Sequence, residues 1–416
     1  ELGCIAGVGV TASHNPPQYN GYKVYWEDGA QITAPKDKQI ITEVQAITDF
    51  AQVKTMSEED AKAAGLYEVI GEEIDDRYME ALKKLVLRPE AIKEQADKLK
   101  IVYTPLHGTG NIPVRRVLKE LGFNNVYVVK EQELPDGDFP TVSYPNPEDK
   151  NAFTLALKLA AEVDADIVLA TDPDADRLGI YAKNEKTGEY ESFTGNMSGM
   201  LILEYLLSQK KELGMLPENG AVVTTIVSGK MARAIAKEYN VALIETLTGF
   251  KYIGEQIKFF EQNHDHEFLF GYEESYGCLE GTHARDKDAV VAVMALCEAA
   301  AYYKSKGITL CEQMEKLYQK YGFYKESLFF QTFPGAEGKA KIDGLMDALR
   351  NEPPKQVGPF KVTALEDYKK SVRTDIATGE TSALTLPESN VLYFELEDGA
   401  WFCVRPSGTE PKIKYY

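Results

Sequence analysis

Short apolar runs alternate with amphipathic stretches through the middle of the chain. Runs rich in β-branched residues predict strands over 100–105, 125–129, 165–172, 221–227, 241–249 and 267–275. The segments between them repeat apolar residues at helical spacing and predict helices over 113–122, 151–163, 230–239, 251–262 and 287–307. Strands that alternate with helices in this way are typical of α/β domains with parallel strands.

The pattern changes after about residue 323. A small α+β module is predicted by a strand over 327–333, a helix over 336–350, a strand over 360–368 and a hairpin over 392–406. We expect loops over 351–357 and 374–389. The whole pattern predicts four domains, at 1–96, 97–200, 201–322 and 323–416.

The composition restricts the kind of protein. In 416 residues there are 46 Lys+Arg against 65 Asp+Glu, a formal charge of −19 that argues against a duplex nucleic-acid binder. No apolar run reaches the roughly 18 residues that a membrane span needs. Five scattered cysteines and the lack of a signal peptide favour a reducing cytoplasm. We therefore expect a cytoplasmic protein with neither a nucleic-acid nor a membrane partner, and the sequence carries no signal of its oligomeric state.

The first of four loops with candidate chemistry is TASHNPPQYNGYK. An apolar strand leads into Ser13, and two prolines make a rigid turn that would fix this hydroxyl at the end of the strand, where open α/β sheets bind ligands. Lys23 follows in the same loop and is a candidate cation or proton donor. A serine that caps a Pro-rich turn is the alternative interpretation, because a hydroxyl needs a base or a phosphoryl group to be chemically active.

The second loop, DPDADR, follows a predicted buried strand. Asp172, Asp174 and Asp176 alternate along it, so their carboxylates can converge on one hard divalent cation. An EF-hand is excluded, because Arg177 and Lys183 stand where that motif has Gly and Glu. Arg177 adds a guanidinium fork that suits a phosphate next to the metal. The alternative is a solvated acidic turn, which is less favourable because closely spaced carboxylates repel one another without a cation.

The third loop is FLFGYEESYG, with LTGFK ahead of it. Glu273, Glu274 and Ser275 end an apolar strand and offer acceptors suited to sugar hydroxyls, whereas the two carboxylates would repel a phosphate. A charged turn that caps the next element is the alternative. Arg285 and Lys287 follow shortly afterwards, ahead of a predicted helix.

The fourth loop is VRPSGTEPK, near the end of the chain. Arg405 supplies a planar donor, and Gly408 lets backbone N–H groups approach an anion closely. Ser407 and Thr409 add two hydroxyls. This set predicts a phosphate-binding loop. A plain hairpin-end turn is the alternative, because Pro-Ser-Gly also forms such turns readily.

TASHNPP, DPDADR, GYEES and RPSGTEPK occur in this order, and through them the whole chain resembles the α-D-phosphohexomutase family. The resemblance implies the α/β class with four domains around a central cleft: three α/β domains with mixed sheets and a C-terminal α+β domain. The residues in and around TASHNPPQYNGYK and GYEESYG are most similar to those of the long branch of the family, which includes phosphoglucomutases, phosphopentomutases and hexose-bisphosphate synthases. The chain starts in a strand-like segment, ends in another and lacks the family's usual upstream Arg-containing loop, so we expect both ends to be trimmed.

The resemblance also implies roles for individual residues. Ser13 would carry the phosphoryl group, and Lys23, with a lowered pKa, would carry a proton. Arg177 and Lys287 would act beside them in catalysis. The Mg²⁺ ligands would be a phosphate oxygen of Ser13 together with Asp172, Asp174 and Asp176. The residues expected to bind the substrate are His14, Thr248, Gly249, Glu273, Ser275, Arg285, Arg405, Ser407, Gly408 and Thr409.

The reaction that the resemblance implies is the interconversion of glucose 1-phosphate and glucose 6-phosphate. It would require Mg²⁺ and run through a phosphoserine and a bound glucose 1,6-bisphosphate, with small sugar phosphates as partners. A phosphomannomutase or a phosphopentomutase of the same family is the nearest alternative. From other classes, a phosphatase using Asp172 and Asp174 would release free phosphate, and a non-catalytic sensor would bind sugar phosphates without turnover.

Overall fold

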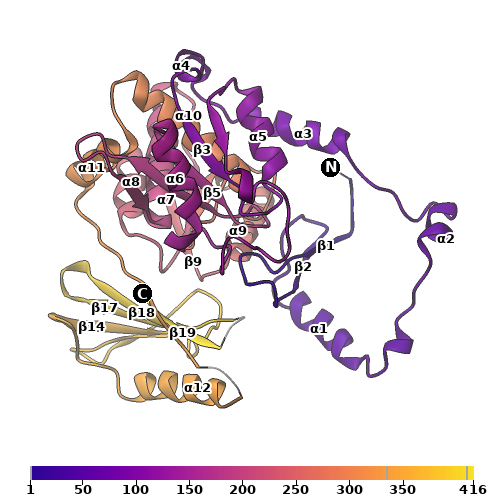
Figure 1. The fold of residues 1–416 in the computed structure, drawn as a ribbon. Helices are drawn as coiled ribbons and strands as arrows, with labels where there is room; N and C mark the ends of the chain where they lie inside the picture. The colour runs from indigo at the N-terminus through magenta and orange to yellow at the C-terminus, as the bar shows by residue number, and fades with distance from the viewer. Residues whose placement is uncertain (1, 334–335, 409–410) are drawn as a thin grey trace. The chain divides into compact units, whose positions relative to one another are not determined.

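The computed structural model describes residues 2–333, 336–408 and 411–416. The chain forms two compact units, Glu1–Phe323 and Tyr324–Tyr416, which are described one at a time. In Figure 1 the first unit runs in colour from indigo to orange and the second from orange to yellow. Thr409 of the predicted phosphate loop lies outside the described residues.

The first unit starts with an antiparallel pair of strands. β1 (Ala6–Val10) and β2 (Tyr22–Trp26) place Val10 opposite Tyr22, so the loop that carries Ser13 is closed at its base. The strand expected within the first ten residues is confirmed in part, because β1 begins only at Ala6. The elements that follow are α1 (Lys36–Ala46), η1 (Phe50–Gln52), α2 (Glu58–Ala63) and α3 (Glu72–Lys83).

A five-stranded sheet carries the acidic loop. Its order is β4 (Val126–Val128), β3 (Ile101–Thr104), β5 (Ile167–Thr171), β6 (Leu178–Lys183) and β7 (Tyr190–Phe193). The first three of these strands are parallel, but β6 runs antiparallel to β5 because the short acidic turn returns the chain directly. The helical segments of this part are α4 (Pro89–Gln95), α5 (Asn111–Glu120), η2 (Lys130–Gln132), η3 (Lys150–Phe153) and α6 (Thr154–Val163).

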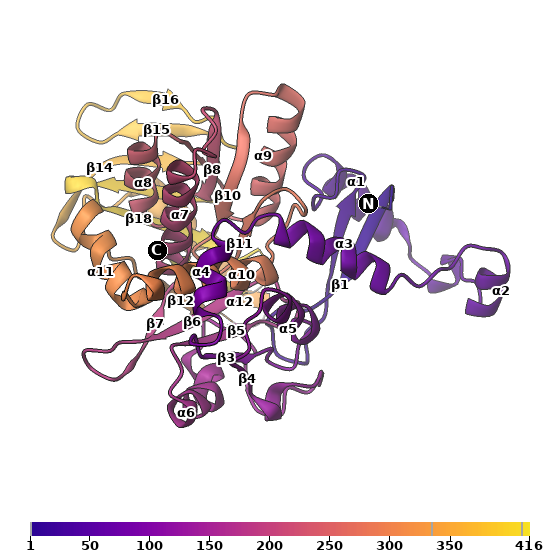
Figure 2. The same cartoon turned by 90° about the horizontal axis from the view of Figure 1, so that it is seen from above.

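A four-stranded sheet carries the third loop. Its order is β11 (Cys278–Glu280), β10 (Glu267–Tyr272), β8 (Gly220–Thr225) and β9 (Ala242–Thr246), and β11 alone in this sheet pairs antiparallel. Its helices are α7 (Gly195–Glu212), α8 (Met231–Tyr239), α9 (Phe250–Asn263), α10 (Ala289–Ser305) and α11 (Leu310–Tyr321). α7 and α8 lie side by side, as Figure 2 shows. α7 was missed by the sequence pattern because it is buried nearly all round, so its apolar residues follow no helical period.

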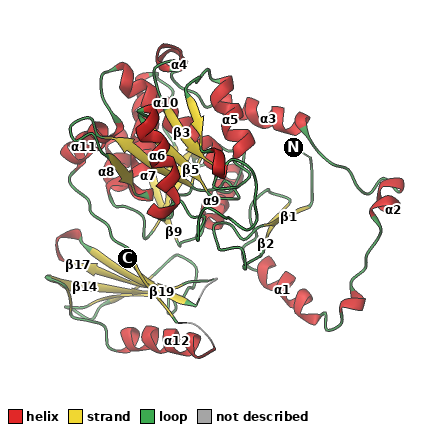
Figure 3. Ribbon diagram, in the orientation of Figure 1, coloured by secondary structure: helices red, strands yellow, loops and turns green. Residues whose placement is uncertain are grey.

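The second unit is an antiparallel sheet with one long helix. Its order is β12 (Phe329–Thr332), β19 (Lys412–Tyr415), β18 (Trp401–Pro406), β17 (Leu392–Leu396), β14 (Phe360–Asp367), β15 (Val372–Asp375) and β16 (Thr381–Ala383), with β13 (Gln356–Val357) paired to β14 and η4 (Glu397–Gly399) before β18. Figure 3 shows α12 (Ala336–Asn351) along this sheet, where Ile342 and Met346 pack into the core. The predicted terminal hairpin is confirmed by β17 and β18.

The predicted loops of the second unit are wrong in part. The stretch 351–357 contains β13 and the stretch 374–389 contains β16, whose exposed Thr-Ser-Ala sequence has no apolar alternation to reveal it. The predicted α/β class with mixed sheets and a C-terminal α+β domain is confirmed. The four domain boundaries stay a prediction. Across the described ranges, none of the helices combines the length and apolar character that a membrane crossing needs.

Candidate active site

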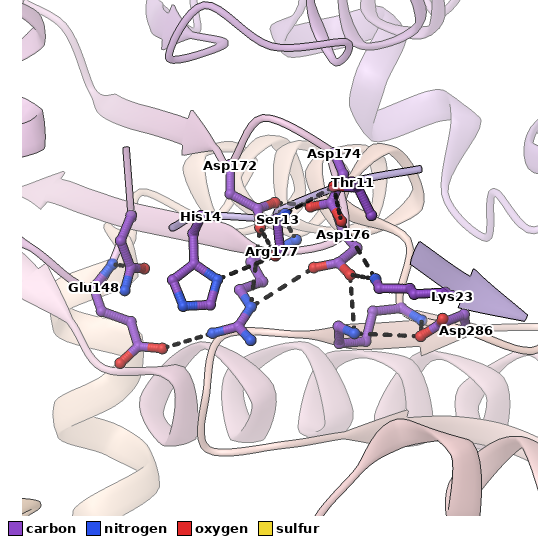
Figure 4. Close-up of polar contacts among 12 residues, drawn as sticks. Thr11, Ser13, His14, Lys23, Glu148, Asp172, Asp174, Asp176, Arg177 and Asp286 are labelled. Atoms are coloured by element: carbon purple, nitrogen blue, oxygen red, sulfur yellow. Dashed lines mark hydrogen bonds and ion pairs between the residues drawn. The ribbon is translucent and has the colours of Figure 1, made fainter. Parts of the chain in front are cut away.

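The loop after β1 brings the Ser13 hydroxyl to the acidic loop after β5 (Figure 4). Ser13 Oγ donates to Asp172 Oδ2 at 3.2 Å and lies 3.1 Å from His14 Nδ1. Thr11 Oγ1 accepts from the Ser13 N–H at 2.7 Å and donates to Asp174 Oδ2 at 3.1 Å. Ser13 has a φ of +51°, a left-handed conformation that turns its side chain at the end of the strand. Two hydrogen bonds therefore fasten the serine turn to the acidic loop.

The three aspartates of the acidic loop converge. Each offers an oxygen within 4.8 Å of the others. Asp172 Oδ1 accepts from the backbone N–H groups of Asp176 at 3.0 Å and Arg177 at 2.9 Å. Among the described residues, the buried Oδ1 atoms of Asp174 and Asp176 have no hydrogen-bond partner. Burial, then the carboxylates of Asp176 and Asp174, raise the pKa of Asp172 well above its ordinary value. Unpaired, mutually repelling oxygens are a donor set that fits a hard divalent cation.

Two lysines meet on one oxygen of the triad. Lys23 Nζ lies 2.8 Å and Lys287 Nζ 2.9 Å from Asp176 Oδ2. Burial and the Lys287 ammonium lower the pKa of Lys23, but Asp176, Asp174 and Asp286 raise it more, so its net pKa lies well above its ordinary value. The expected lowered pKa of Lys23 is therefore wrong, because the sequence did not show that carboxylates surround it.

Glycine at 277 leaves the room that Lys287 occupies. A Cβ on Gly277 would lie 2.1 Å from Lys287 Cδ, far inside van der Waals contact. Asp286 accepts from Lys287 Nζ at 3.3 Å and from the Tyr25 hydroxyl at 3.0 Å, so it links the N-terminal hairpin to the Lys287 segment. Sequence reasoning missed Tyr25 and Asp286, although Asp286 stands between two basic residues that it had singled out.

Arg177 extends from the same loop and pairs with Glu148. Its Nη1 donates to Glu148 Oε1 at 3.0 Å, and its Nε lies 3.7 Å from Asp176 Oδ1. Glu148 was not singled out in the sequence. The signal that marks it is the Pro-Asn-Pro-Glu turn, whose prolines fix the chain just ahead of a carboxylate.

The third loop forms a second group of predicted substrate-binding residues. Buried Glu273 accepts from the Gly249 N–H through Oε1 at 2.8 Å, so it joins the Thr248–Gly249 turn to the Glu273–Ser275 turn. Gly249 has a φ of +125°, which a residue with a Cβ rarely adopts. A backbone bridge between Arg177 and Gly277 connects this group to the acidic loop. Arg285 is not gathered with either group, because its guanidinium pairs with Glu261 of α9.

The predicted phosphate loop belongs to the second unit. Arg405 is in β18 and its Nη1 donates to the Tyr416 hydroxyl at 3.2 Å. The Ser407 N–H donates to the Lys412 carbonyl at 2.8 Å. The turn at Ser407 and Gly408 is therefore closed by the β18–β19 hairpin. The roles of Arg405, Ser407 and Gly408 in phosphate binding stay predictions, as does that of Thr409.

Four family models match the chain along its length. The models of the alpha/beta/alpha domains I, II and III of phosphoglucomutase/phosphomannomutase match residues 1–50, 76–187 and 194–321. The model of the C-terminal domain of the same family matches residues 349–416. The family resemblance that the four loops indicated is confirmed.

Comparison with individual proteins supports the same family and the same fold. A phosphoglucomutase of Staphylococcus epidermidis is 40% identical over 413 residues, which span 99% of this chain and 73% of that protein. The crystal structure of a putative phosphomannomutase from Thermus thermophilus aligns with a TM-score of 0.67 at 21% identity, over 100% of this chain and 75% of that one. An Aspergillus fumigatus N-acetylphosphoglucosamine mutase, in complex with GlcNAc-6P and magnesium, gives a TM-score of 0.52 at 14% identity, over 100% and 85% of the two chains. At these low identities the two structures support the fold.

Proposed function

The chain belongs to the phosphoglucomutase/phosphomannomutase family and is a mutase, and we propose that it interconverts glucose 1-phosphate and glucose 6-phosphate. In the proposed route Ser13 donates a phosphoryl group to the substrate, which gives glucose 1,6-bisphosphate, and then recovers the other phosphoryl group. The observation that carries the proposal is the Ser13 hydroxyl 3.2 Å from Asp172, beside an acidic triad with unpaired buried oxygens. The five free cysteines support a reducing, cytoplasmic setting for this reaction.

Each transfer exchanges one phosphorus–oxygen bond for another. The bond from phosphorus to Ser13 Oγ breaks as the bond to the sugar oxygen forms, Ser13 Oγ takes up a proton and the sugar hydroxyl gives one up. His14 Nδ1, 3.1 Å from Ser13 Oγ, is placed to hold that proton. Lys23 and Lys287, which Asp176 keeps as ammonium ions, suit the stabilisation of negative phosphoryl oxygens rather than the role of a base.

The donor set of the triad fits a magnesium ion. Asp172, Asp174 and Asp176, with a phosphoryl oxygen on Ser13, would hold it, and when bound it would neutralise charge on the transferring group. Arg177 reaches the same region from the end of the acidic loop and would bind a phosphoryl oxygen. Positioning and charge stabilisation of this kind account for most of the catalysis in phosphoryl transfer, because its transition state is loose.

Two turns of the first unit and one loop of the second would hold the sugar phosphate in its two orientations. We assign the sugar hydroxyls to the turns at Thr248–Gly249 and Glu273–Ser275, which one hydrogen bond already joins. The phosphate that does not react would bind at Arg405 and residues 407–409. A loop that recognises phosphate without contacting the ring suits both ends of a bisphosphate that must turn over between the two transfers.

Turnover of three substrates tests the proposal. Glucose 1-phosphate, mannose 1-phosphate and ribose 1-phosphate are supplied with Mg²⁺ and a trace of glucose 1,6-bisphosphate, and the isomerised products are measured. Wild type should convert the glucose ester fastest, and Ser13→Ala should abolish conversion while the circular dichroism spectrum is unchanged. Ser382→Ala, a matched change on the exposed strand β16, should keep full activity. Mass spectrometry should find a phosphoryl group on the Ser13 peptide of the wild-type protein.

Other outcomes would overturn the proposal in identifiable ways. Full activity of Ser13→Ala would exclude the phosphoserine route. Faster conversion of the mannose or the ribose ester would assign one of the related substrates of the family instead. Release of free phosphate would indicate a phosphatase, and binding of sugar phosphates without any conversion would indicate a sensor.

A further inference from the structure

An ion pair at the edge of the acidic triad involves the carboxylate of Glu148, which has no role in the proposed reaction. Glu148 Oε1 accepts from Arg177 Nη1 at 3.0 Å, and the two side chains are 27% and 18% exposed. Arg177 directly follows Asp176 in sequence. Glu148 therefore pairs with a guanidinium that belongs to the acidic loop itself. Figure 4 shows Glu148 and Asp176 contacting this guanidinium from different directions.

The guanidinium lies within ion-pair distance of two triad carboxylates but forms no hydrogen bond with either of them. Arg177 Nε is 3.9 Å from Asp172 Oδ2 and 3.7 Å from Asp176 Oδ1, both beyond a normal hydrogen bond. Within the described part of the chain, this buried Nε and Asp176 Oδ1 each have no hydrogen-bond partner. A shift of less than about 1 Å would close the pair, since N–H···O bonds form at roughly 2.7–3.2 Å. Something must therefore hold the guanidinium back from an attractive partner.

Glu148 is suited to hold the guanidinium in place because the backbone of Glu148 is itself fixed. Asn146 Oδ1 accepts from the Glu148 N–H at 3.0 Å, and the Asp149 N–H donates to the Asn146 carbonyl at 2.9 Å. Pro147 lies against β6 so closely that a Cβ on Gly179 would come within 2.7 Å of Pro147 Cβ. The turn is thus pinned at both ends of the Asn-Pro-Glu sequence, and the carboxylate projects from a rigid support.

We propose that Glu148 is a positioning residue that holds the Arg177 guanidinium away from Asp172 and Asp176. In this role it keeps the carboxylate oxygens open for a divalent cation and keeps the guanidinium available for a phosphoryl group. Without Glu148 the guanidinium gains close ion pairs with both carboxylates and competes with the cation for them. The effect on cation binding stands by itself, and the effect on turnover rests on the proposed function.

Manganese binding tests the proposal without measuring activity. Mn²⁺ is titrated into the full chain and the free ion is measured by electron paramagnetic resonance. Loss of a residue that orients the surroundings of a metal weakens metal binding about tenfold to 100-fold, and we expect Glu148→Ala to raise the Kd for Mn²⁺ by at least about tenfold. Glu148→Gln should restore most of the affinity, because its amide oxygen still accepts from Arg177. Glu162→Ala, an exposed change on α6, is the matched control and should bind like wild type.

Measuring Mn²⁺ binding in an Arg177→Ala protein distinguishes a positioning role of Glu148 from an effect of its negative charge alone. If Glu148 acts through the guanidinium, Glu148→Ala should have no further effect on the Kd in an Arg177→Ala protein. An equal loss in both backgrounds, or an equal loss for Gln and Ala, would show that only the negative charge matters and would overturn the proposal. Unchanged Mn²⁺ binding in Glu148→Ala would overturn it as well. If Glu148→Ala does not fold, Glu148→Leu, which keeps the bulk of the side chain but accepts no hydrogen bond from Arg177, is compared in the same two backgrounds and gives the same decision.

Turnover then reports on the two proposals separately. We expect Glu148→Ala to lower kcat for glucose 1-phosphate more than it changes KM, because the misplaced guanidinium is needed in the transition state. A wild-type protein that binds Mn²⁺ but converts no sugar phosphate would refute the proposed function and leave the positioning role intact. A wild-type protein that turns over, with Glu148→Ala indistinguishable from it in both assays, would refute the positioning role alone.

Discussion

A buried glutamate at the end of β11 makes the stability of the first unit depend on pH. Glu280 is 3% exposed, and among the residues that the structure describes its Oε1 has no hydrogen-bond partner. Burial first, and then the carboxylate of Glu298, raise the pKa of Glu280 from 4.5 to about 8. Glu298 accepts from the Leu87 and Arg88 N–H groups and from the Tyr205 hydroxyl, which leaves none of these donors for Glu280. Glu280 is therefore a protonated carboxyl in the folded protein at neutral pH.

The sign and size of the effect follow from the two pKa values. Between pH 4.5 and about 8 the unfolded chain loses the Glu280 proton while the folded protein keeps it, so stability falls as pH rises. Below this window both states are protonated, and above it both are ionised, so the slope vanishes at either end. At about 1.36 kcal/mol per pH unit, and with the slope fading near each of the two pKa values, the loss between about pH 5 and about pH 8 is about 3–4 kcal/mol. Glu280→Gln removes this loss, because an amide of the same shape does not titrate.

Hydrogen exchange of peptides from β10 and β11 in increasing urea measures the free energy of unfolding of this region. We expect Glu280→Gln to gain about 3–4 kcal/mol relative to wild type on going from about pH 5 to about pH 8. Any fixed cost of the buried amide cancels in this comparison. Glu267→Gln, an exposed change at the start of β10, is the control and should show no pH-dependent gain. A gain for Glu280→Gln that is equal at both pH values would refute the reasoning.

Four further changes have definite expected outcomes. Gly108→Ala should weaken Mn²⁺ binding and cost about 1–3 kcal/mol in thermal unfolding, because its Cβ would lie 2.4 Å from Pro173 Cα in the acidic loop; an unchanged Kd would contradict this. Chelation by EDTA should abolish turnover until Mg²⁺ is restored, and Asp174→Asn should need about tenfold more Mg²⁺ than wild type. Thr309→Ala should destabilise α11 by about 0.5–2 kcal/mol in hydrogen exchange, because it removes a capping box with Glu312, while turnover stays unchanged.

The parts of the fold that follow from local pattern were predictable from the sequence. The strands β3, β5 and β8 and the helices α8 and α10 lie within a few residues of their predicted ranges, because an apolar run or a helical period depends on neighbours in sequence. The aspartate triad was predictable for the same reason, since alternate residues after a buried strand share one turn. The helix α7 escaped because burial on all sides removes the period that marks a helix.

Contacts between distant segments were decided by the tertiary structure. The pairing of Arg177 with Glu148 and of Tyr25 with Asp286 joins residues 29 and 261 positions apart, and no local pattern encodes such partners. The direction of the Lys23 pKa was predicted wrongly for this reason: the sequence shows one cation near a serine, whereas the fold surrounds it with Asp174, Asp176 and Asp286. The local sequence thus determines which chemical groups this protein possesses. Their charge states and orientations depend on the fold, because electrostatic energy is set by distance and burial in space rather than by spacing along the chain.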